Sequence, residues 1–153
     1  MATIDDRLAE LGLTLPEVAK PAGAYVPAII SGQLVFTAGQ LPSTGGVLPA
    51  TGKVGAEVSP EDAKVYARTC VLNGLAAARG VLGSLDRIQK VVKVVGFVAS
   101  DPAFTGQPGV INGASELLGE IFGGAGAHAR SAVGVAVLPL DSPVEIEFVF
   151  EFA

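Results

Sequence analysis

The chain of 153 residues is long enough for one domain with a buried core, and half of its residues are apolar, which excludes a disordered protein. Its formal net charge of −5 and pI near 4.8 argue against a surface that neutralises nucleic-acid phosphates. Charges, prolines and glycines interrupt every run of about 18 residues, so no membrane-spanning helix is expected.

Cysteine and histidine are scarce. The single cysteine, Cys70, permits no internal disulfide, and the single histidine, His128, leaves too few ligands for a zinc or iron site. The chain starts with acidic and polar residues, so no signal peptide is expected. We therefore expect a cytoplasmic protein without metal or cofactor, and its high apolar content predicts association between copies of the chain.

The first half of the chain predicts a short helix, a hairpin and a long helix. Residues 3–13 have helical apolar spacing with Thr3 as N-cap, and residues 21–42 contain two apolar runs joined by the turn "SGQ". A Gly/Pro-rich loop follows at 43–58. Residues 59–84 form the strongest predicted helix, with Ser59 as N-cap and Pro60 in the first turn. Its expected apolar stripe consists of Val65, Cys70, Leu72, Leu75 and Ala76.

The second half predicts a strand at 87–100, a turn at 101–109, a helix at 110–124 and two strands around the turn "LPLDSP". The order α-ββ-α-β-α-ββ predicts an α+β fold. We expect a mixed sheet of five to six strands with two helices on one face and the other face uncovered. Residues 1–153 are expected to form a single domain with a short N-terminal helical extension at about 3–13.

The last two strands are expected to pair as a hairpin closing at Val137 and Val144. Side chains alternate along a strand. One face of the last strand therefore holds Val144, Ile146, Phe148, Phe150 and Phe152, and the other holds Glu145, Glu147, Val149 and Glu151. The preceding strand is expected to turn Val133, Val135 and Val137 toward the same core.

This parity leaves Arg130, the Ala/Gly positions that alternate with the valines and the three glutamates on the uncovered face, which we expect to be the association surface. In this register Arg130 pairs with Glu151 and Ala136 with Glu145. Glu145 then lies roughly 20 Å from Arg130, at about 3.3 Å per residue. The two could share a small ligand only across a subunit interface.

Several segments in this order resemble one known family. They are "YVPAIISGQLVFTAGQLP", "GFVASDPAF", "VINGASELL" and "HARSAVGVAVLP" followed by "VEIEF". Together they resemble the YjgF/YER057c/UK114 family, also called the Rid family, and in particular its longer subgroup often labelled "putative endoribonuclease L-PSP". The resemblance implies a chorismate-mutase-like fold, a homotrimer with a cleft at each subunit interface, and hydrolysis of enamines and imines of the 2-aminoacrylate type to 2-oxo acids and ammonia.

The resemblance also implies roles for five residues of this sequence. The carboxylate-binding arginine falls on Arg130, the tyrosine of a "G-x-Y-V" segment on Tyr25, and a glycine that offers its backbone N–H on Gly39. The helix asparagine falls on Asn112, and the glutamate that orders the attacking water falls on Glu145. Two positions depart from the pattern: Ala38 stands where active members have serine, and Ala132 where many have cysteine.

Each candidate residue also has an ordinary structural explanation. Arg130 could form an ion pair with Glu151, Glu145 could be an interface carboxylate, and Tyr25 could pack at a subunit edge. For the remaining candidates the alternatives are a helix start for Asn112, a turn for Gly39, and a solvated loop for His128, whose imidazole could otherwise transfer protons at the rim of the site. Cys70 is expected to be a core residue.

Two classes of function follow. The first is a trimeric hydrolase of small carboxylated enamines or imines, without cofactor, membrane or nucleic-acid partner. The second is a non-catalytic trimer that binds 2-oxo or amino acids, or acts as a holdase. Endoribonuclease activity ranks last, because the sequence offers no histidine pair, basic stripe or aromatic platform.

Overall fold

The computed structural model describes residues 2–153 and contains three α-helices and five strands within them. In chain order these are α1 (Ile4–Glu10), β1 (Ala28–Ser31), β2 (Leu34–Thr37), α2 (Pro60–Leu82), β3 (Ile88–Ala99), α3 (Gln107–Phe122), β4 (Ala129–Val135) and β5 (Val144–Phe152). The predicted order of helices and strands is confirmed. No helix among the described residues is long and apolar enough to cross a membrane.

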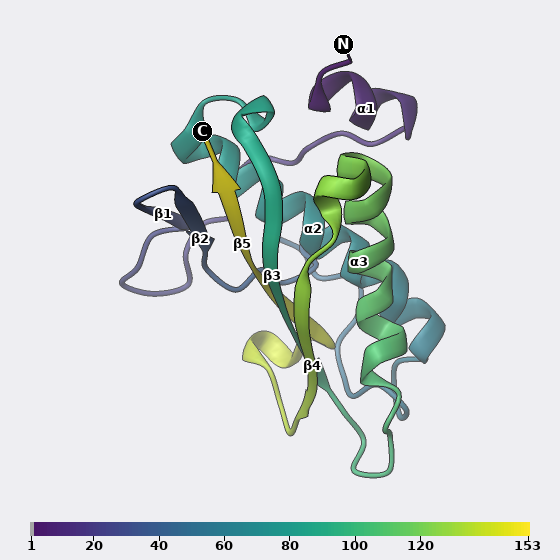
Figure 1. Cartoon of the computed structure of the whole chain (residues 1–153). Coiled ribbons are helices and arrows are strands. Elements are labelled where there is room, and N and C mark those ends of the chain that lie inside the picture. The colour runs from purple at the N-terminus through teal and green to yellow at the C-terminus, as the bar shows by residue number, and fades with distance from the viewer. Residues whose placement is uncertain (1) are drawn as a thin grey trace.

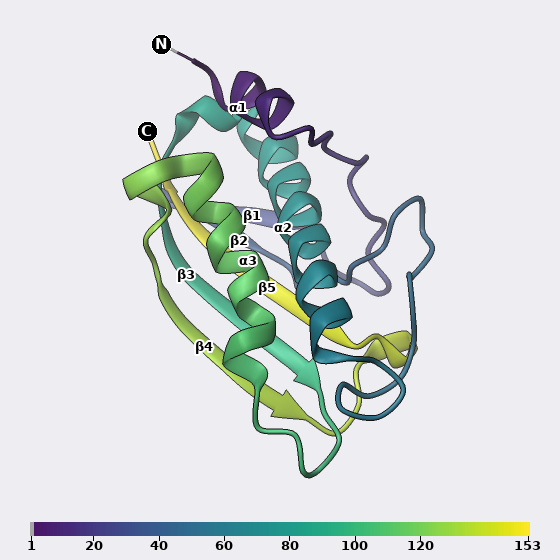
Figure 2. The ribbon, with the colours of Figure 1, turned by 90° about the vertical axis from the view of Figure 1, so that its right-hand side faces the viewer.

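The five strands form one mixed sheet in the order β1-β2-β5-β3-β4. Only β3 and β4 are parallel, and the other neighbouring pairs are antiparallel. Helices α2 and α3 lie side by side across one face of this sheet (Figure 1 and Figure 2). The α+β fold with two helices on one face of a mixed sheet is therefore confirmed, and we call the other side the open face.

Local capping rules account for where the helices begin. Thr3 forms a capping box at α1, and the Ser59 hydroxyl accepts the backbone N–H of Asp62 at α2, both as predicted. Helix α3 begins at Gln107, three residues earlier than predicted, because Pro108 occupies its first turn, where a helix tolerates proline. The segment "QPG" thus belongs to the helix and not to the preceding turn.

The buried residues of α2 differ from the predicted apolar stripe near the start of the helix. Cys70 and Leu75 are buried, but Val65 is 58% exposed. The helix buries small residues because it lies close to β5: a Cβ atom at Gly74 would lie 2.5 Å from the Phe148 ring. Burial raises the pKa of the Cys70 thiol, which fits its predicted role as a core residue.

The expected hairpin between β4 and β5 is wrong. Strand β3 lies between them, and Arg130 stands opposite Val94, whereas Glu151 stands opposite Lys90. The pairings Arg130–Glu151 and Ala136–Glu145 therefore do not exist. The physical reason is that α3 connects β3 to β4, and a helical crossover places its two strands parallel and adjacent. Proximity in sequence to β5 does not determine the neighbour of β4.

The predicted orientation of β4 is wrong as well. Arg130 shares the helix-covered face with Val94, and Val133 is 44% exposed on the open face. The small residues of β4 make room for α3, since a Cβ atom at Gly134 would lie 2.8 Å from the Gln107 amide nitrogen. For β5 the predicted parity is confirmed: its phenylalanines are buried in the core, and its glutamates lie on the open face.

Candidate functional site

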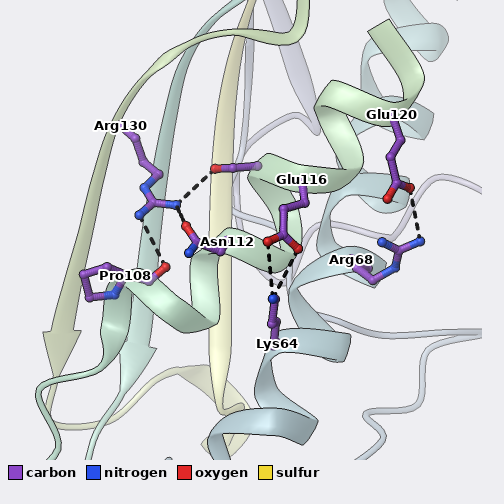
Figure 3. A network of polar contacts seen from close by, with 8 residues as sticks. Lys64, Arg68, Pro108, Asn112, Glu116, Glu120 and Arg130 are labelled. Carbon is purple, nitrogen blue, oxygen red and sulfur yellow. Dashed lines mark hydrogen bonds and ion pairs between the residues drawn. The ribbon is translucent and has the colours of Figure 1, made fainter. Parts of the chain in front are cut away.

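The Arg130 guanidinium is held in place by α3. Its Nη1 donates hydrogen bonds to Asn112 Oδ1 at 2.8 Å and Ser115 Oγ at 3.1 Å, and its Nη2 donates to the Pro108 carbonyl at 3.3 Å (Figure 3). These bonds occupy three of the five N–H donors of an arginine. The Nε–H and one Nη2–H have no partner within residues 2–153 and remain for a ligand.

His128 extends this network through Ser115. Its Nδ1 lies 2.7 Å from the Gly126 carbonyl oxygen, which can only accept a hydrogen bond, so Nδ1 carries a proton. In the neutral ring Nε2 then accepts from the Ser115 hydroxyl, 2.9 Å away. That leaves a Ser115 lone pair for the Arg130 donor. A continuous line of hydrogen bonds thus runs from Gly126 through His128 and Ser115 to the guanidinium.

A hollow of about 460 Å³ opens beside this network. Glycines and Ala127 form much of its wall, and its polar side chains are those of Ser115, His128 and Arg130. Asn112 lies in the second turn of α3, so it is not an N-cap, and its side chain serves the arginine and not the helix backbone. This part of the molecule offers an anion a fixed guanidinium with two free donors.

Tyr25, Gly39 and Glu145 gather at a different place. A Cβ atom at Gly39 would lie 2.5 Å from Glu145 Oε2, so only glycine lets the carboxylate lie against the chain there. The Tyr25 hydroxyl accepts the backbone N–H of Ala22 at 3.0 Å and keeps its own proton for donation. Tyr25 and Gly39 both line a cavity of about 680 Å³.

Glu145 is the carboxylate with perturbed acidity. It stands on the open face opposite Phe97 and is half-buried. Burial raises its pKa, and the negative charge of Glu147 raises it further. Such a carboxylate is a stronger base than an ordinary glutamate and can hold or deprotonate a water molecule.

The predicted site residues therefore form two groups. Arg130, Asn112 and His128 come together beside α3, whereas Gly39 lies against Glu145 and shares a cavity with Tyr25. The chain does not bring the two groups to one point. Ala38 lines the larger cavity, and Ala132 lies half-buried on the same face as Arg130.

Sequence reasoning missed Ser115. A signal was present, because Ser115 follows Asn112 by three residues and therefore lies on the same side of the helix.

Ion pairs near the network, such as Lys64–Glu116, join α2 to α3 at the surface (Figure 3). Within residues 2–153 no cluster of three or more His, Cys, Asp or Glu side chains could hold a metal ion.

The chain is similar to known proteins in both sequence and structure. Residues 5–153 match the model of the family described as "YjgF/chorismate mutase-like, putative endoribonuclease". The structure resembles that of Atu1372 from Agrobacterium tumefaciens, a protein of unknown function, with 46% identity and a TM-score of 0.90 over 98% of this chain and 92% of the other.

Two further solved structures are similar. One is described as a "putative endoribonuclease" from Shewanella oneidensis MR-1, with 34% identity and a TM-score of 0.95 over 99% of this chain and 100% of the other. The second is Escherichia coli TdcF with bound serine, with 26% identity and a TM-score of 0.65 over 91% of this chain and 94% of the other.

Proposed function

The chain belongs to the YjgF/chorismate mutase-like family, and we propose that it hydrolyses small carboxylated enamines and imines to 2-oxo acids, in a cleft completed by a second copy of the chain. The observation that carries this proposal is the Arg130 guanidinium, which Asn112 and Ser115 fix while two of its N–H donors stay free. A planar fork of this kind binds a carboxylate through two parallel hydrogen bonds. The serine bound to the relative TdcF also carries a carboxylate.

The proposed reaction begins with substrate held by its carboxylate on Arg130. The Gly39 backbone N–H and the Tyr25 hydroxyl supply further donors. An enamine such as 2-aminoacrylate first takes a proton on its terminal carbon and becomes the imine. Water held by Glu145 then attacks the C=N carbon, with its proton passing to the carboxylate. Glu145 returns that proton to the imine nitrogen, which gives the carbinolamine, and then carries the proton of the carbinolamine hydroxyl to the amino group. The C–N bond breaks, ammonia leaves, and a 2-oxo acid remains.

The two groups of site residues require a second copy of the chain. Arg130 lies on the helix-covered face and Glu145 on the open face, so one ligand touches both only when they come from different subunits. The open face supports association, because it carries exposed apolar side chains, among them Ile29, Phe36 and Val133. We propose a homotrimer with three such clefts. Light scattering should give a mass near three times 15.4 kDa.

A second candidate is a trimer that binds 2-oxo or amino acids without turnover. Ala38 and Ala132 favour it, because methyl groups stand near the two halves of the site where a hydroxyl or thiol could have assisted proton transfer. Ribonuclease activity remains the weakest candidate. The net charge is −5, and the single imidazole, His128, is engaged by Ser115 and Gly126.

A coupled assay tests the proposed function. A serine dehydratase generates 2-aminoacrylate, and the appearance of pyruvate is followed with and without this protein. We expect faster pyruvate formation with the wild-type chain and no acceleration with Arg130→Ala or Glu145→Gln. A folded oligomer that binds pyruvate but never accelerates its formation would refute the hydrolase and support the binding protein. RNA cleavage abolished by neither substitution would refute both.

A further inference from the structure

The larger cavity points to the size and polarity of the substrate. We infer, on the basis of the proposed function, that this cavity receives the side chain of the substrate and that this side chain is apolar and bulky, of about the size of a leucine or phenylalanine side chain. The cavity of about 680 Å³ lies in the range of roughly 300–1,000 Å³ typical of pockets for whole organic ligands. A three-carbon enamine would leave most of it empty.

The cavity connects to the proposed site through two shared residues. Tyr25 and Gly39 line it, and Gly39 is in contact with the Glu145 carboxylate. A substrate whose C=N carbon lies beside Glu145 can therefore extend its remaining substituent past Gly39 into this cavity.

The cavity is lined mainly by apolar residues, which favour burial of an apolar group. Apolar side chains from three segments line the cavity: Pro16, Val18, Ala19, Leu41, Leu48 and Leu140. The amide of Asn73 already donates both of its hydrogen bonds, to the carbonyls of Leu41 and Ser43. The Gln40 amide donates to the Ala38 carbonyl. Glu17, Lys20, Ser43 and Thr44 also line the cavity, and Glu17, Lys20 and Thr44 are exposed to solvent. Because most of the lining residues are apolar and the amides of Asn73 and Gln40 are engaged within the protein, the cavity favours an apolar group over a polar one.

The segment from residue 16 to residue 22 forms one side of the cavity and is fixed at two points. Val18 lies against α2, where a Cβ atom at Gly80 would be 3.7 Å from its methyl group. The backbone N–H of Ala22 donates to the Tyr25 hydroxyl at 3.0 Å. The wall is therefore tied both to a core helix and to a proposed site residue.

A strained turn forms another part of the wall. Leu140 and Asp141 adopt positive φ angles of 59° and 58°, which non-glycine residues rarely do. Lys53 pairs with the Asp141 carboxylate, and the Gly52 N–H donates to the Asp141 carbonyl at 2.9 Å. The Leu140 side chain stays 73% exposed as a result. Strain of this kind persists where neighbouring contacts impose it, and here it presents an apolar side chain to the cavity.

Calorimetric titration with stable 2-oxo acids tests this inference. The wild-type oligomer should bind 4-methyl-2-oxopentanoate about tenfold to a hundredfold more tightly than pyruvate, the gain expected for burying a leucine-sized group. Ala19→Phe, which narrows the cavity, should remove this preference. Ala103→Phe, a matched change at an exposed position outside the cavity, should leave both affinities unchanged.

A second variant tests the inference independently, in case Ala19→Phe disturbs folding. Leu140→Ala should reduce the preference severalfold, and Val65→Ala, which also shortens an exposed apolar side chain, should not. If pyruvate binds and the preference is absent, or survives both Ala19→Phe and Leu140→Ala, the inference is wrong and the proposed function stands. If neither acid binds to a folded oligomer, the proposed function fails together with the inference.

Discussion

Arg130 and Glu145 project from opposite faces of the same sheet. Arg130 stands opposite Val94 on the helix-covered face, and Glu145 stands opposite Phe97 on the open face, with β3 between their strands. Their Cα atoms are offset by about 10 Å along the strands and by about 9.6 Å across two strand spacings. The sheet itself thus separates the proposed anion-binding group from the proposed base, which is why we propose that one chain alone holds only half of each cleft.

Truncating Arg130 should abolish ligand binding without unfolding the protein. Arg130→Ala removes a charged, forked contact, which should cost about 2–4 kcal/mol of binding free energy for a 2-oxo acid. Arg130→Lys keeps the charge but loses the fork that Asn112 and Ser115 orient, so it should recover only part of the affinity. Calorimetry measures both, and circular dichroism checks the fold. Full affinity in Arg130→Lys would contradict bidentate capture.

Ser115 should act on the ligand through Arg130. Ser115→Ala removes the oxygen that accepts from Nη1 and donates to His128, which should weaken carboxylate binding by about 1 kcal/mol, or roughly fivefold. The Michaelis constant should rise with little change in turnover number, because the serine does not touch the reacting atoms. Ser115→Thr should restore binding. Glu116→Gln, one residue away and paired with Lys64 at the surface, should have no effect.

Glu147 should set the acid limit of activity through its charge on Glu145. If the ionised carboxylate holds the attacking water, activity falls as the pH drops through the pKa of Glu145, which lies above the usual range of a glutamate. Glu147→Gln removes the nearby negative charge and lowers that pKa, so the acid limb of the pH–rate profile should move to lower pH. Glu151→Gln, six residues along β5 from Glu145, should leave the limb in place.

The free energy of unfolding should also depend on the titration of Glu145, but this contribution decreases as the pH rises. The pKa of Glu145 is higher in the folded chain than in the unfolded chain, so the protonated carboxyl favours the folded state. This contribution is present below the unfolded pKa and is lost as the pH rises through the folded pKa. Glu145→Gln should remove it. Urea titrations across the acid range would contradict the assignment if the wild type and Glu145→Gln showed the same pH dependence.

Two glycines of α3 should respond oppositely to alanine. A Cβ atom at Gly113 would lie 2.1 Å from the Lys64 carbonyl oxygen, so Gly113→Ala must push α2 and α3 apart and should cost about 1–3 kcal/mol. A Cβ atom at Gly119 would have no atom from outside its own helix backbone within 4 Å, and Gly119→Ala should gain about 0.5–1 kcal/mol of helix stability. Urea unfolding measures both. Equal effects would contradict the close packing of the two helices.

The parts of this structure that depend on local chemistry could be predicted from the sequence. The caps at Thr3 and Ser59 and the alternating phenylalanines of β5 follow from short-range rules. The neighbour of β4 could not, because strand order depends on where α3 packs. Valines on β4 suggest a core face, yet Val133 is exposed, since only small residues fit under the helix. That one error displaced Arg130 to the wrong face.

The candidate site could likewise be predicted only in part. The residue types of Arg130, Asn112 and Glu145 could be selected from the resemblance to a family, but their grouping required the sheet topology. Asn112 and Ser115 become partners of Arg130 only because β4 runs parallel to β3 beneath α3. The prediction that Arg130 and Glu145 belong to different subunits stays a prediction. It now rests on opposite faces of the sheet instead of distance along a hairpin.

Mixing two inactive variants tests this composite cleft. Arg130→Ala supplies an intact Glu145, and Glu145→Ala supplies an intact Arg130, so subunit exchange should restore hydrolysis. In a cyclic trimer each cleft pairs Arg130 of one subunit with Glu145 of its neighbour, and an equimolar random mixture should regain about a quarter of the wild-type activity. As a control, Arg130→Ala mixed with the double variant Arg130→Ala/Glu145→Ala contains no intact arginine and should stay inactive. Mass spectrometry under native conditions confirms the exchange. If mixed trimers form and activity does not return, Arg130 and Glu145 do not complete each other across an interface, and the proposed cleft is wrong even if the protein is a trimer.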